Sequence, residues 1–145
     1  MTDESNQDVL FDGLALIRDT LLPNLLKEDQ SAILYWAGKE LARDFAFSDF
    51  QELAQAVKRL SFGTIELKEH KKTAYRIHLT GAAIESRLKR NQKADFSLEA
   101  GFLAEAIQQL SGYYSEGSWQ TSTSQQHVDI RIESDPKEKI TEQTY

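Results

Sequence analysis

Cysteine is absent from this chain of 145 residues. Without thiols the chain can form no disulfide, no cysteine nucleophile and no thiolate metal site, which fits a reducing compartment. Proline occurs only twice, and the seven glycines are scattered along the chain, so no glycine-rich phosphate loop is present. No apolar run approaches the roughly 18 residues that a membrane-spanning helix needs. The sequence therefore predicts a protein without a membrane span.

Basic residues are fewer than acidic ones. The chain carries 17 Lys and Arg against 23 Asp and Glu, which gives a formal net charge of -6. Phosphate contacts need a surplus of basic residues, so this balance argues against a nucleic-acid partner. The basic run at 87–90 is interpreted as a solvated helix face. Residues 1–8 are acidic and polar, unlike a signal peptide, and we expect a cytoplasmic protein.

The length of the chain fits one domain with a core of its own. Hydrophobic residues make up 40% and charged residues 28%, a mixture typical of soluble globular proteins. Residues 1–8 and 134–145 lack apolar periodicity and are interpreted as a disordered N-terminal tail and a flexible C-terminal tail. A single domain is therefore expected over residues 9–133.

The first half of the domain has the spacing of helices. Leucines and isoleucines recur at helical intervals over residues 10–25, and Pro23 is expected to kink or interrupt that helix. Asp29 is a suitable N-cap for a second helix. Ser48 and Gln51 have the spacing of a capping box that opens a third. The second helix is expected to bury one stripe: Leu34, Ala37, Leu41 and Phe45.

The second half alternates between two periods. Apolar residues at every second position predict strands in pairs, and each pair is separated by a short polar turn. Helical spacing returns between the two hairpins, and Gly112 is expected to end the last helix. The pattern predicts an α+β fold: a four-stranded antiparallel sheet with about five helices packed on one face. The strands are expected at 64–68, 75–79, 117–123 and 128–133, and the last two helices at 81–92 and 97–111.

Two helical segments, residues 33–45 and 98–110, follow one plan of large apolar residues mixed with small ones. Each contains one glycine, Gly38 or Gly101, at a position where glycine costs roughly 1 kcal/mol relative to alanine. A helix keeps such a glycine when another backbone or a ligand must come close. The sequence leaves these two alternatives open.

The strings at 34–43, 86–89 and 98–105 carry a family resemblance. From about residue 10 to residue 133 the chain resembles the uncharacterised YslB-like family of low-GC Gram-positive bacteria. That family is similar to the four-vinyl-reductase domains and TRAPP small subunits, the ligand-binding fold of NO signalling and Golgi transport. The resemblance implies an antiparallel sheet covered by helices, pairing into dimers and, in some members, an apolar ligand held inside. The acylated or metal-binding cysteines of some relatives have no counterpart here.

The candidate ligand-binding residues lie on the two glycine-containing helices. They can form the rim of a pocket, with aromatic faces for an apolar ligand and cations for a carboxylate or phosphate head. They can also border a helix–helix or dimer contact, which is the interpretation we favour. If Glu105 is buried, it needs a partner such as Arg43 or Arg87. The candidates are Tyr35, Trp36, Gly38, Lys39, Arg43, Gly101 and Glu105.

No pattern in the chain indicates catalysis. His70, His78 and His127 have neither the spacing of a metal site nor a nucleophile motif beside them, so we expect no enzyme, no cofactor and no metal. The sequence favours a non-enzymatic cytoplasmic interaction module that forms a homodimer through its helical layer. The alternative is a small-molecule or lipid-binding domain with an apolar cavity near Gly38 and Gly101.

Overall fold

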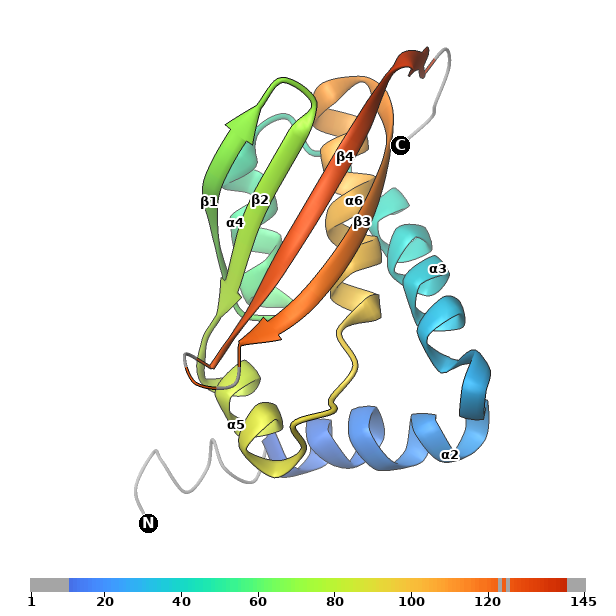
Figure 1. Ribbon diagram of the computed structural model, residues 1–145, viewed down its shortest axis with the longest axis vertical. Helices are drawn as coiled ribbons and strands as arrows, with labels where there is room; N and C mark the ends of the chain where they lie inside the picture. Colours follow the sequence, from blue (N-terminus) through green and yellow to red (C-terminus); the bar gives the residue numbers. More distant parts are fainter. Residues whose placement is uncertain (1–10, 123, 125, 141–145) are drawn as a thin grey trace.

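A computed structural model describes residues 11–122, 124 and 126–140. One antiparallel sheet has the strand order β1-β2-β4-β3, so that two hairpins join through their inner strands (Figure 1). This is the sheet that the alternating pattern predicts. Its strands are β1 (Thr64–Lys71), β2 (Ala74–Thr80), β3 (Tyr113–Ser122) and β4 (His127–Lys139).

Apolar side chains of the central strands form the covered face of the sheet. Ile77 of β2 lies opposite Ile130 of β4, and Leu79 lies opposite Val128. All four are fully buried. The residues between them are polar or charged and occupy the other face, because successive side chains of a strand point to opposite sides. One face of the sheet therefore needs cover and the other does not.

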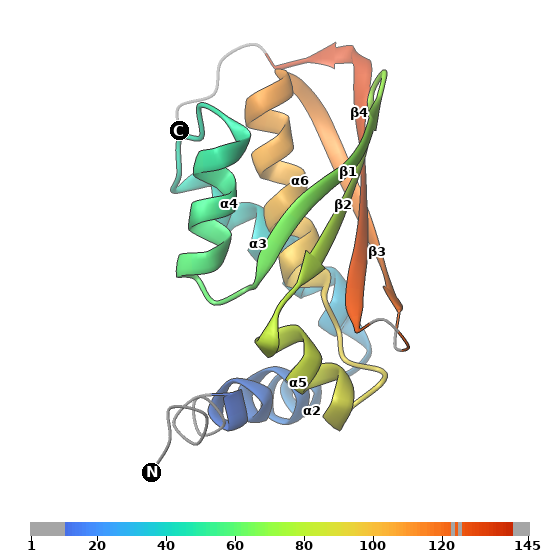
Figure 2. The same cartoon turned by 90° about the vertical axis from the view of Figure 1, so that its left-hand side faces the viewer.

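Three helices provide that cover: α3 (Gln30–Arg43), α4 (Phe50–Arg59) and α6 (Ser97–Ser111). Figure 2 shows them on one side of the sheet, with the other side uncovered. Helix α6 lies against the sheet and is buried over most of its length. Helices α2 (Leu22–Leu26) and α5 (Ala82–Arg90) lie beyond one end of the sheet. The α+β prediction is confirmed, with α2 and α5 displaced from the covered face.

The first helix is irregular around Pro23. Residues 11–16 are α-helical, and a π-helical turn, η1 (Ile17–Leu21), precedes α2. The Leu22 N–H donates to the Ile17 carbonyl, and Pro23 occupies the first turn of α2, where its missing N–H costs least. The helix thus continues through Pro23, and its irregularity is the π-helical turn before the proline. A 3₁₀ turn, η2 (Lys27–Asp29), then leads into α3.

The predicted buried stripe of the second helix is largely wrong. Helix α3 buries Leu34, Gly38 and Ala42, whereas Ala37 and Phe45 are only half-buried and Leu41 is 44% exposed. The physical reason is the glycine: the face that carries Gly38 allows the closest approach to α6. The helix is therefore rotated away from the face that its larger apolar residues favour.

Two boundaries also differ from the prediction. The cap of α4 is shifted by one residue: Asp49 accepts a hydrogen bond from the Glu52 N–H at 2.8 Å, and the Glu52 carboxylate accepts one from the Ser48 N–H at 2.9 Å. Ser48 and Gln51 do not form the capping box. Strand β4 runs to Lys139, and residues 134–139 therefore belong to the sheet and not to a tail. The expected tails at 1–8 and from 141 onward lie outside the described residues.

Ser134 explains why the strand continues. Its N–H donates to the Thr73 carbonyl at 2.9 Å, and its buried hydroxyl lies 2.6 Å from that of Ser115 on β3. The polar sequence after residue 133 hides these contacts, since neither serine has an apolar signal. In the part of the chain described here, no helix combines the length and apolarity needed to span a bilayer.

Candidate functional site

Helices α3 and α6 touch through their backbones at the two predicted glycines. A Cβ atom on Gly38 would lie 2.1 Å from the Leu98 carbonyl oxygen, and one on Gly101 would lie 2.0 Å from the Tyr35 carbonyl oxygen. No heavy atom fits at such distances. The close approach that both glycines permit is therefore filled by protein backbone, which leaves no room between them for the apolar cavity of the alternative interpretation.

Tyr35 and Lys39 of α3 reach the edge strand β3. The Tyr35 hydroxyl donates to the Glu116 carboxylate and accepts from the Gly117 N–H at 2.8 Å. The Lys39 ammonium lies 3.0 Å from the other oxygen of Glu116. Burial and the hydrogen bond to Glu116 raise the pKa of Tyr35. These contacts satisfy an edge-strand donor and fasten α3 beside the sheet.

The carboxylate of Glu116 responds to the same contacts. Partial burial raises the pKa of Glu116. The hydrogen bonds from Tyr35 and Lys39 together lower it by more, so that the net pKa lies below its ordinary value. The carboxylate is thereby held ionised beside the lysine.

Arg43 and Glu105 also meet, as the sequence predicts for a buried Glu105. Glu105 is fully buried, and the Arg43 Nε lies 3.2 Å from its Oε1. The same guanidinium contacts Glu40 at 2.8 Å. A buried carboxylate that is held by an arginine is a structural ion pair. Arg87, the other expected partner, lies elsewhere.

Trp36 points away from these contacts and is 62% exposed. It belongs to a set of large apolar side chains on η1, α2, α3 and the helical residue before η1, each between 42% and 66% exposed. We call this set the apolar helical surface. It comprises Leu16, Ile17, Leu21, Leu25, Ile33, Trp36 and Leu41.

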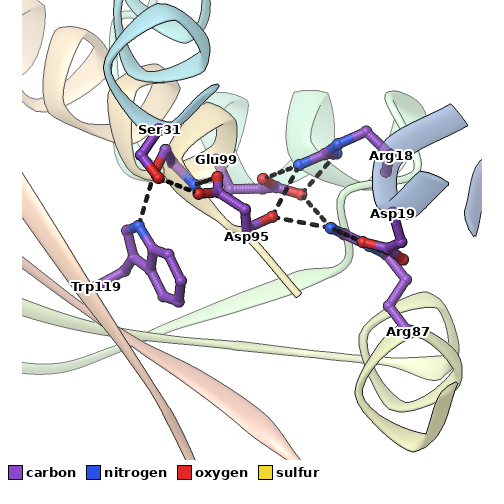
Figure 3. Close-up of polar contacts among 8 residues, drawn as sticks. Arg18, Asp19, Ser31, Arg87, Asp95, Glu99 and Trp119 are labelled. Atoms are coloured by element: carbon purple, nitrogen blue, oxygen red, sulfur yellow. Dashed lines mark hydrogen bonds and ion pairs between the residues drawn. The ribbon is translucent and has the colours of Figure 1, made fainter. Parts of the chain in front are cut away.

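A buried ion-pair network, formed by Arg18, Asp19, Arg87 and Glu99, lies where η1, α5 and α6 meet (Figure 3). Arg18 donates to both oxygens of Glu99, at 3.0 and 2.7 Å. Arg87 donates to Asp19 at 2.7 and 3.1 Å, and its third nitrogen lies 3.4 Å from Glu99. No member has a side chain more than 9% exposed. The two positive and two negative charges balance.

Arg18 stays charged inside this network. Burial lowers its pKa, but the charge and hydrogen bonds of Glu99, with smaller contributions from Asp19 and Asp95, raise it above the ordinary value. Arg87 lies with its guanidinium 4.4 Å above the centre of the Phe96 ring, which adds a cation–π contact. The basic run at 87–90 is therefore not a uniformly solvated face, because its first residue is buried.

Asp95 connects the network to α3 and β3. Its backbone carbonyl accepts from Arg87 at 2.8 Å, and its carboxylate accepts from the Ser31 hydroxyl and the Ser97 N–H. Ser97 in turn accepts from the indole N–H of Trp119 at 3.0 Å. Figure 3 shows Ser31 of α3, Arg87 of α5 and Trp119 of β3 around Asp95. The arrangement joins helices α3, α5 and α6 to strand β3.

The three histidines lie on the hairpins. His70 stacks on Tyr75 with ring centres 4.0 Å apart, and His78 stacks on His127 at 4.2 Å. Burial and the neighbouring His127 lower the pKa of His78, whereas Asp129 raises it by less. Over the described residues, no three or more His, Cys, Asp or Glu side chains are placed to hold a metal ion.

Arg18 and Asp19 are among the site residues that sequence reasoning missed. Their partners Arg87 and Glu99 lie 68 and 81 residues away in the chain, so no local spacing relates them. The only signal is weak: two adjacent charged residues inside a helix otherwise rich in leucine and isoleucine. Charges in that position are also typical of a solvated face, and only the tertiary contacts separate the two alternatives.

Comparison with known sequences finds one family and one curated relative. The family described as "Protein of unknown function (DUF2507)" matches residues 11–133. The "Uncharacterized protein YslB" of Bacillus subtilis (strain 168) is 34% identical over 125 residues, which cover 86% of this chain and 84% of that protein. The predicted resemblance to the YslB-like family is confirmed.

Solved structures share the fold at low identity. A vinyl-4-reductase family protein of Methanocaldococcus jannaschii has a TM-score of 0.60 and 21% identity, covering 70% of this chain and 68% of its own. Trafficking protein particle complex subunit 3 of Naegleria fowleri, covalently bound to palmitic acid, has a TM-score of 0.60 and 15% identity. The match covers 93% of this chain and 99% of that chain. The phenol-responsive sensory domain of the transcription activator PoxR, with phenol, has a TM-score of 0.62 and 10% identity. The match covers 86% of this chain and 74% of that chain.

Proposed function

Because the chain belongs to the DUF2507 family of proteins of unknown function, no activity comes with its membership, and we propose that it is a non-enzymatic, cytoplasmic interaction module. The module pairs with a second copy of itself through the helical layer. One observation carries this proposal: the apolar helical surface leaves seven large apolar side chains between 42% and 66% exposed.

Exposed apolar side chains on consecutive helical segments from residue 16 to residue 41 favour a protein partner, because a soluble domain seldom leaves so many of them in water. Trp36 and Ile33 lie on the side of α3 that faces away from the glycine contact with α6. A tryptophan at the centre of a contact commonly contributes a large share of the binding energy. In a twofold dimer the same surface serves both copies, so no second complementary surface is needed.

The remaining features of the domain support an interaction role more than an enzymatic one. The buried charged groups are engaged in ion pairs that join helices, and the tyrosine and lysine on α3 hold an edge strand. Palmitic acid and phenol are named with two neighbours of the same fold, but here the space at Gly38 and Gly101 is taken by backbone. The lipid-binding alternative therefore has no support at that position.

Light scattering coupled to size-exclusion chromatography tests the dimer. We expect a dimer at micromolar concentration for the natural chain and a monomer for Trp36→Glu and Ile33→Glu, because a carboxylate would be buried in the contact. Leu60→Glu is the matched control: Leu60 is 41% exposed, close to the 42% of Ile33, but lies at the end of α4. A strictly monomeric natural chain, or a Trp36→Glu variant that still pairs, would rule out this contact.

A further inference from the structure

The uncovered face of the sheet contains an open hollow of about 560 Å³, which we call the sheet hollow. Two adjacent rows of outward side chains form it. In one row Ala74 lies beside Glu133 and Glu116, and in the next Arg76 lies beside Arg131 and Ser118. The small side chains of Ala74 and Ser118 leave the space that the longer ones surround. Small-molecule sites typically have volumes of about 300 to 1,000 Å³.

Two arginines from neighbouring strands line this hollow. Arg76 of β2 and Arg131 of β4 are paired positions, and like charges directly opposite one another destabilise a sheet. Only one carboxylate, Asp129, lies between them. Its oxygens are 3.2 and 3.3 Å from the Nε of Arg76 and 3.9 Å from the Nε of Arg131. Within the described residues, the terminal nitrogens of both guanidinium groups have no protein acceptor.

The other carboxylates around the hollow are engaged elsewhere. Glu116 is held by Tyr35 and Lys39 from α3, and Glu133 accepts a hydrogen bond from the Thr73 hydroxyl at 2.9 Å. On β1, Glu69 lies 3.6 Å from its neighbour Lys71. Over the described residues, none of these three carboxylates accepts a hydrogen bond from Arg76 or Arg131, so the terminal nitrogens of the two arginines can take an acceptor from outside the chain.

We propose that the sheet hollow binds a small molecule that carries a carboxylate or phosphate group, held by the terminal nitrogens of Arg76 and Arg131. A guanidinium group presents its donors in a planar fork that matches two oxygens of such an anion, and two such forks can hold one anion. The anion also relieves the repulsion between the arginines. The site lies on the face opposite the helical layer, so it does not depend on the proposed dimer.

Nuclear magnetic resonance titration of the 15N-labelled full chain tests the site with two probes, inorganic phosphate and succinate. Sodium chloride at matched ionic strength controls for screening. We expect saturable shifts of the Nε–H signals of the two arginines and of the Ser118 amide. Arg131→Gln should raise the dissociation constant about fivefold or more, as expected for a lost charge-assisted hydrogen bond. Arg59→Gln, an exposed arginine on α4, is the matched control.

A second variant separates shape from charge. Ala74→Leu fills the floor of the hollow without changing any charge, and it should abolish the saturable shifts while thermal unfolding stays that of the natural chain. Saturation by phosphate alone or by succinate alone supports the site and identifies the anionic group. The proposal is overturned if neither probe saturates, if Arg131→Gln binds as tightly as Arg59→Gln, or if Ala74→Leu leaves binding unchanged.

Discussion

Helix α6 is held on two sides by two different kinds of contact. On one side Gly101 touches the backbone of α3, and on the other Glu99 joins the buried ion-pair network with η1 and α5. The two residues are two positions apart, which places them about 200° apart around the helix. One contact depends on the absence of a side chain, and the other depends on the presence of every charge.

This difference determines how each contact fails. The glycine contact tolerates no added atom, because the opposing atoms belong to the backbone and cannot move away by rotating a side chain. The network tolerates no missing member, because a buried charge without its partner costs far more than the pair contributes. Substitutions should therefore lower stability most in the network, less at the glycine contact, and least at the polar contact between α3 and β3.

Removing a charge from the network is expected to have the largest effect. Glu99→Gln leaves Arg18 without its bidentate acceptor and should lower the free energy of unfolding by about 3 to 5 kcal/mol. Urea unfolding followed by circular dichroism measures the loss. Glu85→Gln, on the exposed side of α5, is the matched control and should change stability little. An equal loss in both variants would contradict a special role for the network.

Adding a methyl group to the glycine contact should have the next largest effect. Gly101→Ala forces α3 and α6 apart and should cost about 1 to 3 kcal/mol, even after the better helix propensity of alanine. Gly38→Ala should behave alike. Gly13→Ala is the control, since nothing lies within 4 Å of its Cβ position, and it should stabilise the helix by up to about 1 kcal/mol. If Gly101→Ala matches Gly13→Ala in thermal unfolding, the backbones are not in contact.

The polar contact between α3 and β3 should contribute least. Tyr35→Phe leaves the Gly117 N–H without its acceptor and should cost about 1 kcal/mol near neutral pH. The folded-state pKa of Glu116 lies below its ordinary value of 4.5. At a pH between the two values the unfolded chain therefore binds more protons than the folded chain. Stability from this contact is therefore present above about pH 4.5 and lost as the pH falls through the lower folded-state pKa. The difference between Tyr35→Phe and the natural chain should shrink in acid; a constant difference would contradict the role of Glu116.

Much of the candidate site could be predicted because its residues share two short strings. Gly38 and Gly101 stand out as glycines inside helical patterns, and Arg43 is correctly identified as a partner for a buried Glu105. These strings do not contain every residue with which the candidates make contact. Glu116, which both Tyr35 and Lys39 bind, lies on a strand more than 75 residues away and has no distinguishing sequence signal.

The sequence by itself determines the α+β order of elements, because alternation such as Val128, Ile130 and Ile132 requires one covered sheet face and helical spacing supplies the cover. Only the tertiary structure decides which face of α3 is buried, that the backbones fill the space at the glycines, and that Arg18 and Arg87 lie inside. Periodicity reports how residues repeat along one element. Close approach and charge pairing depend on a second element, whose position relative to the first no local pattern encodes.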